Sequence, residues 1–510
     1  MILVVLDGWG VAPKNKGNAV TLAKTPTMDG LLKKYPNTLL NASGKYVGLL
    51  DGQPGNSEAG HMNIGAGRLV EQDDLKITRS IEDGTFFKNA AFHEAIHHVK
   101  KWKSKLHIMG MISNGQSPHS NPLHLETLLK VARNNGIKDS VLHLFTDGRD
   151  SPKYASLKLI QELRNKLEEE EVIGTVMGRF YAMDRKKEWS RTEKAYNALV
   201  LGEGKSARTS LEAITEAYNR GESDEYVEPY VIKKNGKMLP RISDHDSIIF
   251  FNLRSDRARQ LAKAFVQKDF NKHNKGAFKR KKAVANLHFV AMTDFGPDLA
   301  SILTAFPSID IKETLPFALK NLRQLYIAET EKYAHVTYFL NGGYAGNVAG
   351  EDQFMVPSPR VKMYDEVPAM SSHLLTKKVI DNLKKNKYDF TFLNFAAPDM
   401  IGHTGNLNAG IACIHAVDKC LGEIVDAYLK KNGTVVVTAD HGNIEEMINL
   451  KTGEIDTEHS VNPVPFLIIN KKIKNLKIKN KGTLSDIAPT VCELLGLKKP
   501  KEMTGKSLIK

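Results

Sequence analysis

The chain has 510 residues, enough for two or three domains with substantial cores. Its 41% hydrophobic and 25% charged content is ordinary for a globular protein, and no apolar run approaches the roughly 18 residues of a membrane span. The start, Met1–Asp7, lacks the positive region and the apolar length of a signal peptide. Three cysteines provide no disulfide framework, so we expect a reducing, cytoplasmic location.

The net charge of +14 raises the question of nucleic-acid binding. The clearest basic clusters, Lys279–Lys282 and Lys471–Lys481, contain no aromatic residue that could stack on a base. A solvated edge or loop explains them better, and binding of small anions is an alternative explanation for arginines elsewhere. We therefore expect a small-molecule substrate and no contact with nucleic acid or membrane; a monomer is expected as well.

Short apolar runs alternate with helical patterns almost throughout the chain, which is typical of βα units. The predicted fold class is therefore α/β with mostly parallel sheets. After the first strand, which ends at Asp7, the predicted strands are Leu106–Ile112, Val141–Phe145, Ile248–Phe251, Leu287–Met292, His335–Phe339, Phe390–Phe395, Thr434–Thr438 and Phe466–Ile469, and the predicted helices are Ser156–Leu167, Asp256–Gln267, Ser372–Lys384, Ala409–Leu429 and Ser485–Leu495.

Three of these strands run into acidic residues. The first ends at Asp7, the strand Phe390–Phe395 is followed by Asp399, and Thr434–Thr438 leads into Asp440 and His441. Ligands of open α/β sheets bind beyond the carboxyl ends of the strands, so we expect these ends to form one site.

Further candidate ligands lie near these strand ends. Asp399 and His403 are one helical turn apart, and His459 stands alone in the last third of the chain. With Asp7, Asp440 and His441, they amount to three carboxylates and three imidazoles, which suffice for two divalent ions. The alternative for any single pair is a buried, hydrogen-bonded Asp–His contact.

Ser57 is the candidate nucleophile. It lies in the glycine-bearing segment Gly52–His61, where glycines permit close approach of a ligand to the backbone. Ala59 occupies the second glycine position of a hydrolase nucleophile elbow, so that motif is excluded. The segment is interpreted as a flexible loop whose serine could bind a metal and be deprotonated by it. The alternative is a turn in which Ser57 caps a helix.

A zinc-protease motif, H-E-x-x-H, occurs at His93–His97. Phe92, Ile96 and Val99 would form the packed stripe of that helix, with the two histidines beside it. No pattern supplies a third ligand, so we expect no protease.

Arginines after predicted strands suggest an anion-binding site. Arg254 and Arg257 follow Ile248–Phe251, and Arg149 with Asp150 follows Val141–Phe145. Guanidinium groups grip phosphate and carboxylate bidentately, and a neighbouring carboxylate could act as general acid or base. Surface ion pairs are the alternative for each single arginine.

The distribution of these residues predicts two domains. The middle of the chain carries the arginines and is predicted to be an anion-binding domain. It is inserted into a domain that carries the candidate metal ligands, with boundaries near Leu69–Asp73 and Phe306–Ile309.

These motifs match one family nearly end to end: the chain resembles the cofactor-independent (2,3-bisphosphoglycerate-independent) phosphoglycerate mutases. The Ser57 and Glu329 blocks are the most specific. The resemblance covers residue 2 to the C-terminus and rests on Leu6–Gly10, Gly55–Arg68, Thr146–Asp150, Gly178–Arg185, Ala328–Thr337, Pro398–Gly405 and Thr438–Asn443.

The resemblance implies an alkaline-phosphatase-like domain over residues 1–71 and 306–510, with a transferase domain over residues 72–305. It also implies two divalent metal ions, usually manganese, one on Asp399, His403 and His459 and the other on Asp7, Ser57, Asp440 and His441. Substrate contacts implied by the resemblance come from His119, Arg149, Asp150, Arg179, Arg185, Arg254, Arg257 and Lys332.

Departures from the usual family pattern include the loop Ser113–Asn121, which carries His119, and Ala397 in place of a frequent asparagine. The implied reaction interconverts 3-phosphoglycerate and 2-phosphoglycerate in glycolysis and gluconeogenesis through a phosphoserine at Ser57, with Asp150 and Lys332 assisting. Alternatives are a phosphopentomutase or phosphatase of the same superfamily and, from another class, a basic nucleic-acid-binding or scaffold protein.

Overall fold

The computed structural model describes residues 1–115, 117–296, 298–299, 302–308, 311–344, 346–473 and 476–510. The predicted features Ser113–Asn121, Phe306–Ile309 and Lys471–Lys481 each include residues outside these ranges. The chain divides into two units: Met1–Gln72 with Ile309–Lys510, and Asp73–Ser308.

The first unit is built on an eight-stranded sheet in the order β13-β12-β14-β1-β15-β16-β2-β17. The five strands from β13 to β15 are parallel, whereas β16 runs against both neighbours. The bounds are β1 Ile2–Leu6, β2 Asn37–Asn41, β12 Gln324–Glu329, β13 Asp352–Val356, β14 Phe390–Phe395, β15 Val435–Thr438, β16 Val464–Ile469 and β17 Lys481–Thr483.

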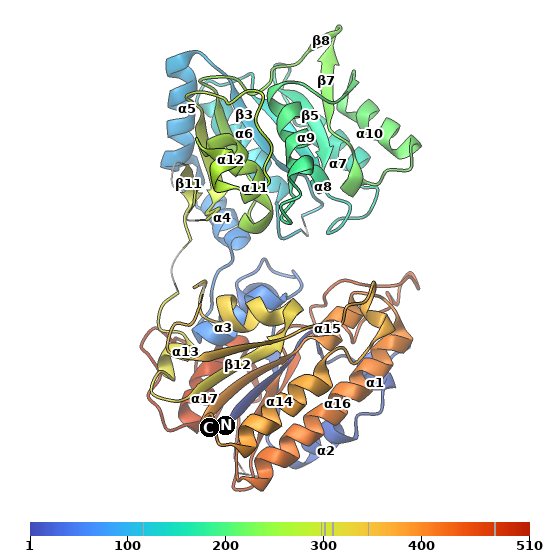
Figure 1. Ribbon diagram of the computed structural model, residues 1–510, viewed down its shortest axis with the longest axis vertical. Coiled ribbons are helices and arrows are strands. Elements are labelled where there is room, and N and C mark those ends of the chain that lie inside the picture. The colour runs from blue at the N-terminus through green and yellow to red at the C-terminus, as the bar shows by residue number, and fades with distance from the viewer. Residues whose placement is uncertain (116, 297, 300–301, 309–310, 345, 474–475) are drawn as a thin grey trace. The chain divides into compact units, whose positions relative to one another are not determined.

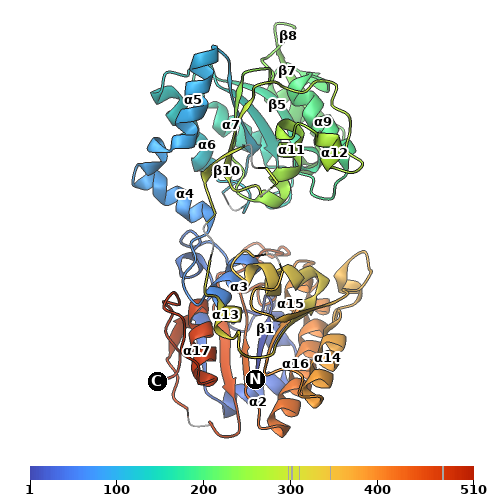
Figure 2. The same cartoon turned by 60° about the vertical axis from the view of Figure 1, so that its left-hand side comes forward.

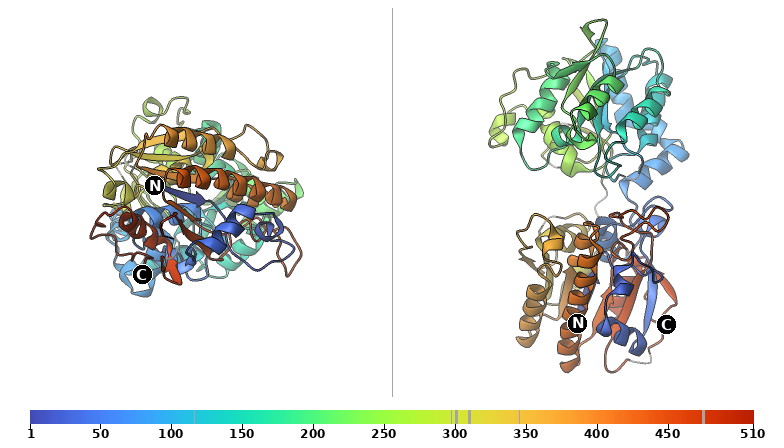
Figure 3. Two further views of the ribbon diagram at one scale, coloured as in Figure 1. Left: turned by 90° about the horizontal axis from the view of Figure 1, so that it is seen from below. Right: turned by 90° about the vertical axis from the view of Figure 1, so that its right-hand side faces the viewer.

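Helices cover both faces of this sheet. The long α16 and α14 lie side by side along one face (Figures 1 and 3), while α17 lies on the other (Figure 2). Because helices cover both faces, the central strands are apolar and fully buried, as in β1 and β15. The helices are α1 Ala19–Leu22, α2 Pro26–Lys34, α3 Ser57–Ala66, α13 Leu315–Ala318, α14 Ser372–Lys384, α15 Ala397–Gly402, α16 Leu407–Lys430 and α17 Ile487–Leu494.

The second unit has its own sheet in the order β11-β10-β9-β3-β4-β5-β7-β6, with β8 paired to β7. Its strands are parallel except at the β5–β7 and β7–β8 pairs. The bounds are β3 Leu106–Met111, β4 Val141–Thr146, β5 Val172–Gly178, β6 Lys205–Ala207, β7 Tyr230–Lys234, β8 Lys237–Met238, β9 Ser247–Phe250, β10 His288–Thr293 and β11 Leu303–Phe306.

Helices also flank the second sheet and enclose separate apolar clusters on its two sides. They are α4 Asp73–Glu82, α5 Ala90–Trp102, α6 Pro122–Asn134, α7 Ser156–Arg164, α8 Arg179–Ala182, α9 Trp189–Val200, α10 Ser210–Asn219, α11 Ser255–Val266 and α12 Phe270–His273. Among the described residues, no helix of either unit combines the length and apolarity needed to cross a membrane.

The predicted α/β class with mostly parallel sheets is confirmed, and the five predicted helices and seven of the eight predicted later strands appear with small shifts at their ends. The strand at His335–Phe339 is wrong. This segment is a π-helical turn that packs against α3, and the strand of this region is β12. A short apolar run does not distinguish strand from helix, so tertiary packing decides.

The helix α5 carries the zinc-protease motif without a metal site. Phe92, Ile96 and Val99 are buried, whereas His93 and His97 are exposed. Nε2 of His93 donates to the Phe87 carbonyl at 2.9 Å. Within the described residues, the groups dense enough to hold a metal ion lie elsewhere, in the first unit.

Candidate metal centre and arginine cluster

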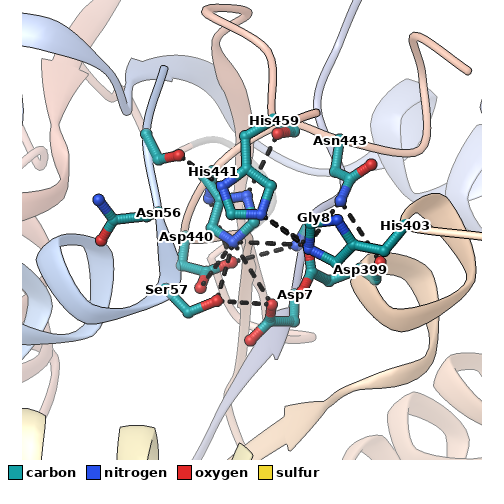
Figure 4. Close-up of polar contacts among 12 residues, drawn as sticks. Asp7, Gly8, Asn56, Ser57, Asp399, His403, Asp440, His441, Asn443 and His459 are labelled. Atoms are coloured by element: carbon teal, nitrogen blue, oxygen red, sulfur yellow. Dashed lines mark hydrogen bonds and ion pairs between the residues drawn. The ribbon is translucent and has the colours of Figure 1, made fainter. Parts of the chain in front are cut away.

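Asp7, Asp399 and Asp440 lie together at the carboxyl edge of the first sheet. They follow β1, β14 and β15, which are adjacent and parallel, so the strands deliver their last residues to one place. All three aspartates are buried. Figure 4 shows their side chains turned toward one another and toward three histidines. The fold thus builds the site that the strand ends predict.

His441 is the central imidazole of this cluster. Its Nε2 lies 3.5 Å from Asp7 Oδ1, 3.6 Å from Asp440 Oδ2 and 3.8 Å from Asp399 Oδ1. Two groups of ligand atoms converge within 4.8 Å: Asp7, Asp440 and His441, and Asp399, His441 and His459. His441 belongs to both groups, whereas the family resemblance implies that it serves one metal.

His403 and His459 complete the cluster beside Asp399. Nε2 of His459 lies 3.2 Å and Nε2 of His403 lies 3.4 Å from Asp399 Oδ1. The two Nε2 atoms are 3.1 Å apart. His403 reaches this point because it is the C-cap of the short helix α15, one turn after Asp399.

Backbone carbonyls fix the orientation of all three imidazoles. Nδ1 of His403 donates to the Thr457 carbonyl at 2.8 Å and Nδ1 of His459 to the Gly55 carbonyl at 2.8 Å, while Nδ1 of His441 lies 3.2 Å from the Gly442 carbonyl. Each Nδ1 therefore carries a proton, and the Nε2 atoms turn inward. Outer hydrogen bonds of this kind are typical of metal-binding histidines, and the converging nitrogen and carboxylate donors fit divalent metal ions.

Ser57 lies next to this cluster at the start of a helix. Its Oγ is 2.9 Å from His441 Nε2 and 3.2 Å from Asp7 Oδ1. The segment is a loop only as far as Asn56, so the interpretation of Ser57 as a loop residue is wrong, and so is the helix-cap alternative. Ser57 is the first residue of α3, and Asn56 caps the helix by accepting from the Ala59 amide. Ser57 therefore lies on a regular helix and is buried.

Lys332 inserts a cation between the carboxylates. Its Nζ donates to Ser57 Oγ at 2.6 Å and lies 2.7 Å from Asp7 Oδ1 and 2.6 Å from Asp399 Oδ2. The residue follows β12 in the 3-10 turn Thr330–Lys332 and is buried. Burial disfavours the charged form, but the two carboxylates outweigh it and raise the pKa of Lys332 above its ordinary value.

The cluster shifts the pKa values of its own members. Burial opposes ionisation of Asp7, but Lys332 and His441 outweigh it and hold the pKa below the usual range. Burial likewise disfavours the His441 imidazolium, but the surrounding aspartates, Asp440 foremost, raise the pKa to about 10. Since a metal ligand must be deprotonated, metal binding at His441 would displace a proton.

Supporting residues without a predicted role surround the ligands. The amide of Asn394 donates to Asp7 Oδ2 at 2.7 Å and to His61 Nε2 at 3.0 Å. Nδ1 of His61 then faces the Ser57 carbonyl and Asp440 Oδ2. Asn443 donates to Asp399 Oδ1 at 2.7 Å. His61 and Asn443 lie within recognised motifs, but only the fold shows that they contact ligands.

Gly8 is required where β1 approaches α15. Its φ of +71° lies in the left-handed region, and a Cβ would lie 2.8 Å from Asp399 Cα and Cβ. We predict that Gly8→Ala lowers both the melting temperature and the content of bound divalent metal, because it displaces Asp7 or Asp399. Circular dichroism and elemental analysis measure the two effects. Gly30→Ala is the control, since a Cβ there meets no atom within 4 Å; normal metal content in Gly8→Ala would contradict the prediction.

Predicted substrate residues of the second unit gather at the carboxyl ends of β4, β5 and β9. Arg179 pairs with Asp147 and Asp150, and His119 Nε2 lies 3.9 Å from Asp150 Oδ2. His119 is buried although its loop is atypical for the family. Asp256 links Arg185 at 2.6 Å and Arg254 at 3.3 Å.

Electrostatics show that further arginines are close together. Burial, followed by the charges of Arg179, Arg185 and Arg149, lowers the pKa of Arg257 to about 10. Asp147, Asp150 and Asp256 offset part of this positive charge, and an anionic ligand would offset more of it. The arrangement therefore favours an anionic ligand over isolated surface ion pairs.

The fold and the convergent acid and histidine donors define a metalloenzyme, and the model of the metalloenzyme superfamily matches residues 1–499. Proteins named 2,3-bisphosphoglycerate-independent phosphoglycerate mutase are 46% identical in Acetivibrio thermocellus and 47% identical in Clostridium kluyveri, each covering 100% of this chain and 99% of the relative. A crystal structure of Leishmania mexicana phosphoglycerate mutase at low cobalt concentration superposes with a TM-score of 0.82 at 30% identity, covering 100% of this chain and 97% of that one. The chain belongs to the 2,3-bisphosphoglycerate-independent phosphoglycerate mutase family.

Proposed function

We propose that this enzyme interconverts 3-phosphoglycerate and 2-phosphoglycerate through a phosphoserine at Ser57, without 2,3-bisphosphoglycerate. The observation that carries the proposal is the position of Ser57 Oγ, which contacts Asp7, His441 and Lys332 at 3.2, 2.9 and 2.6 Å. A serine beside metal-type ligands and a buried ammonium is suited to accept a phosphoryl group.

Two divalent ions, most simply Mn²⁺, are proposed for the metal centre. When bound, they supply the positive charge that keeps Ser57 deprotonated and offsets the charge of the phosphoryl oxygens. One ion is assigned to Asp399, His403 and His459, and the other to Asp7, Ser57, Asp440 and His441.

Phosphoryl transfer then proceeds in two balanced halves. In the first, a bond forms between Ser57 Oγ and phosphorus while the bond from phosphorus to the glycerate oxygen breaks. That oxygen receives a proton, which the Asp150 carboxylate passes to it from the other glycerate hydroxyl. In the second half, the hydroxyl oxygen that has lost its proton attacks the phosphoserine, and the bond between phosphorus and Ser57 Oγ breaks. The Lys332 ammonium stabilises the charge on the phosphoryl oxygens throughout.

The arginine cluster is proposed to bind the anionic glycerate part of the substrate. Arg179 orients Asp150, and burial of that carboxyl is outweighed by Arg179 and His119, which lower its pKa. The proposed contacts to substrate are His119, Arg149, Asp150, Arg179, Arg185, Arg254, Arg257 and Lys332. A carboxylate-bearing phosphate ester matches this set better than the sugar phosphate of a phosphopentomutase.

The proposed setting is glycolysis and gluconeogenesis in the cytoplasm, with the chain acting as a monomer on a small molecule and not on nucleic acid. Its three cysteines are free and buried, which agrees with a reducing compartment.

An enolase-coupled assay on 3-phosphoglycerate tests this proposal. Without added 2,3-bisphosphoglycerate, we expect turnover that EDTA abolishes and Mn²⁺ restores. Removal of the metals takes away the positive charge that would activate Ser57 and offset the charge of the phosphoryl oxygens. Release of inorganic phosphate in place of 2-phosphoglycerate would indicate a phosphatase. Turnover that is indifferent to metal removal would refute the mechanism.

A further inference from the structure

Glu445 is a buried carboxylate beside the metal centre with no role in the proposed reaction. Its Oε2 accepts from the backbone amides of Gly10 at 3.0 Å and Asn443 at 2.8 Å. Its Oε1 accepts from the Ser460 hydroxyl and from Asn462 Nδ2 at 3.0 Å. The side chain is fully inaccessible to solvent.

These donors belong to three separate segments that each carry proposed metal ligands. Gly10 follows Asp7 at the end of β1, and Asn443 follows Asp440 and His441. Ser460 directly follows His459. One carboxylate therefore connects segments that supply ligands to each of the two proposed metal sites, although its hydrogen bonds within the described residues go to none of the ligand side chains.

The backbone around Glu445 is shaped to admit it. A Cβ at Gly10 or at Gly442 would overlap the Glu445 carboxylate. The Ser460 amide donates to the Gly442 carbonyl at 2.9 Å, which joins the segment of His459 to that of His441. No lysine or arginine in the described part of the chain forms an ion pair with Glu445. Its negative charge is offset by hydrogen-bond donors, so removing the charge or an acceptor loosens all three segments together.

We propose that Glu445 is a positioning residue that sets the ligand geometry of both metal sites. The proposal rests on the metal assignment given under the proposed function. Residues that orient metal ligands typically contribute about 10- to 100-fold to metal affinity. Because the ligands themselves remain in place, excess metal compensates for a loosened site.

The test is Glu445→Gln, which keeps the shape of the side chain but replaces one acceptor oxygen by a donor. Titration calorimetry of EDTA-treated protein with MnCl₂ measures affinity, and thermal unfolding of the same metal-stripped protein measures stability. We expect Mn²⁺ binding to weaken about 10- to 100-fold. Turnover is expected to fall at low Mn²⁺ and to recover as Mn²⁺ is raised.

Glu351→Gln is the matched control. Glu351 is a buried carboxylate of the same unit that accepts from the amides of Val348 and Ala349 at 2.9 and 2.8 Å, and from Asn341 and Gln353. None of these donors adjoins a proposed ligand. This variant should lower the melting temperature but leave Mn²⁺ affinity unchanged.

Unchanged Mn²⁺ affinity in Glu445→Gln would overturn the proposal, whatever happens to the melting temperature. Should that variant fail to fold, Ser460→Ala removes one of the four donors, and it must also weaken Mn²⁺ binding for the proposal to stand. Asp399→Ala separates the metal assignment from the positioning role of Glu445. If Asp399→Ala binds Mn²⁺ like the wild type, the metal assignment fails. If Asp399→Ala loses binding while Glu445→Gln keeps it, only the positioning role fails.

Discussion

Ser57→Ala is expected to abolish mutase turnover and the phosphoenzyme together. The mutation removes the protein atom proposed to form a bond with phosphorus, and loss of a nucleophile typically lowers kcat by about 10⁴-fold or more. The fold should survive, because Asn56, not Ser57, caps α3. The enolase-coupled assay measures turnover, and radiolabelled 3-phosphoglycerate with acid quenching measures phosphoenzyme.

Ser485→Ala is the appropriate control for this experiment. Ser485 is another buried serine of the first unit and lies in the turn that leads into α17, where its hydroxyl bonds to Thr483. Its removal should leave turnover and phosphoenzyme unchanged. Substantial mutase activity in Ser57→Ala would refute the phosphoserine mechanism, whereas loss of turnover with a retained phosphoenzyme would identify a different phosphorylated residue.

Lys332→Met is expected to lower kcat about 10²- to 10³-fold, the usual loss when one charge-stabilising donor is removed. Burial favours a neutral lysine, but Asp399 and Asp7 outweigh it and raise the pKa of Lys332 above its ordinary value. The ammonium therefore stays protonated across the working pH range and contributes a full positive charge. The enolase-coupled assay of the manganese-loaded variant measures the loss.

Metal content separates this effect from damage to the metal centre. Lys332 competes with cations for Asp7 and Asp399, so its replacement should leave Mn²⁺ binding as tight as in the wild type or tighter. Lys332→Arg, which keeps the charge, should retain more turnover than Lys332→Met. Loss of Mn²⁺ from Lys332→Met would show that the lysine acts by maintaining the site.

Local patterns predicted most of the elements and the chemical types of the ligands. The alternation of apolar strands with helices marks βα units, and the acids after β1, β14 and β15 mark strand ends, because both signals depend on residues close in sequence. The same patterns were ambiguous at His335–Phe339 and Ser57. The two segments pack against each other, because Ser57 begins α3 and the turn His335–Phe339 contacts this helix. Tertiary packing therefore decided the structure of both.

By itself, therefore, the sequence determined the α/β class, the metal-type donors, the arginines of the middle region and, through the resemblance, the family. Only the tertiary structure decided which of these residues meet. The strand order brings Asp7 beside Asp399 and Asp440, and the turn after β12 brings Lys332 to Ser57, across 275 residues. The tertiary structure also decided the orientation of the histidines and the contacts of Glu445. The physical reason is that such distances depend on sheet order and on buried hydrogen bonds to distant backbone groups, which no local pattern encodes.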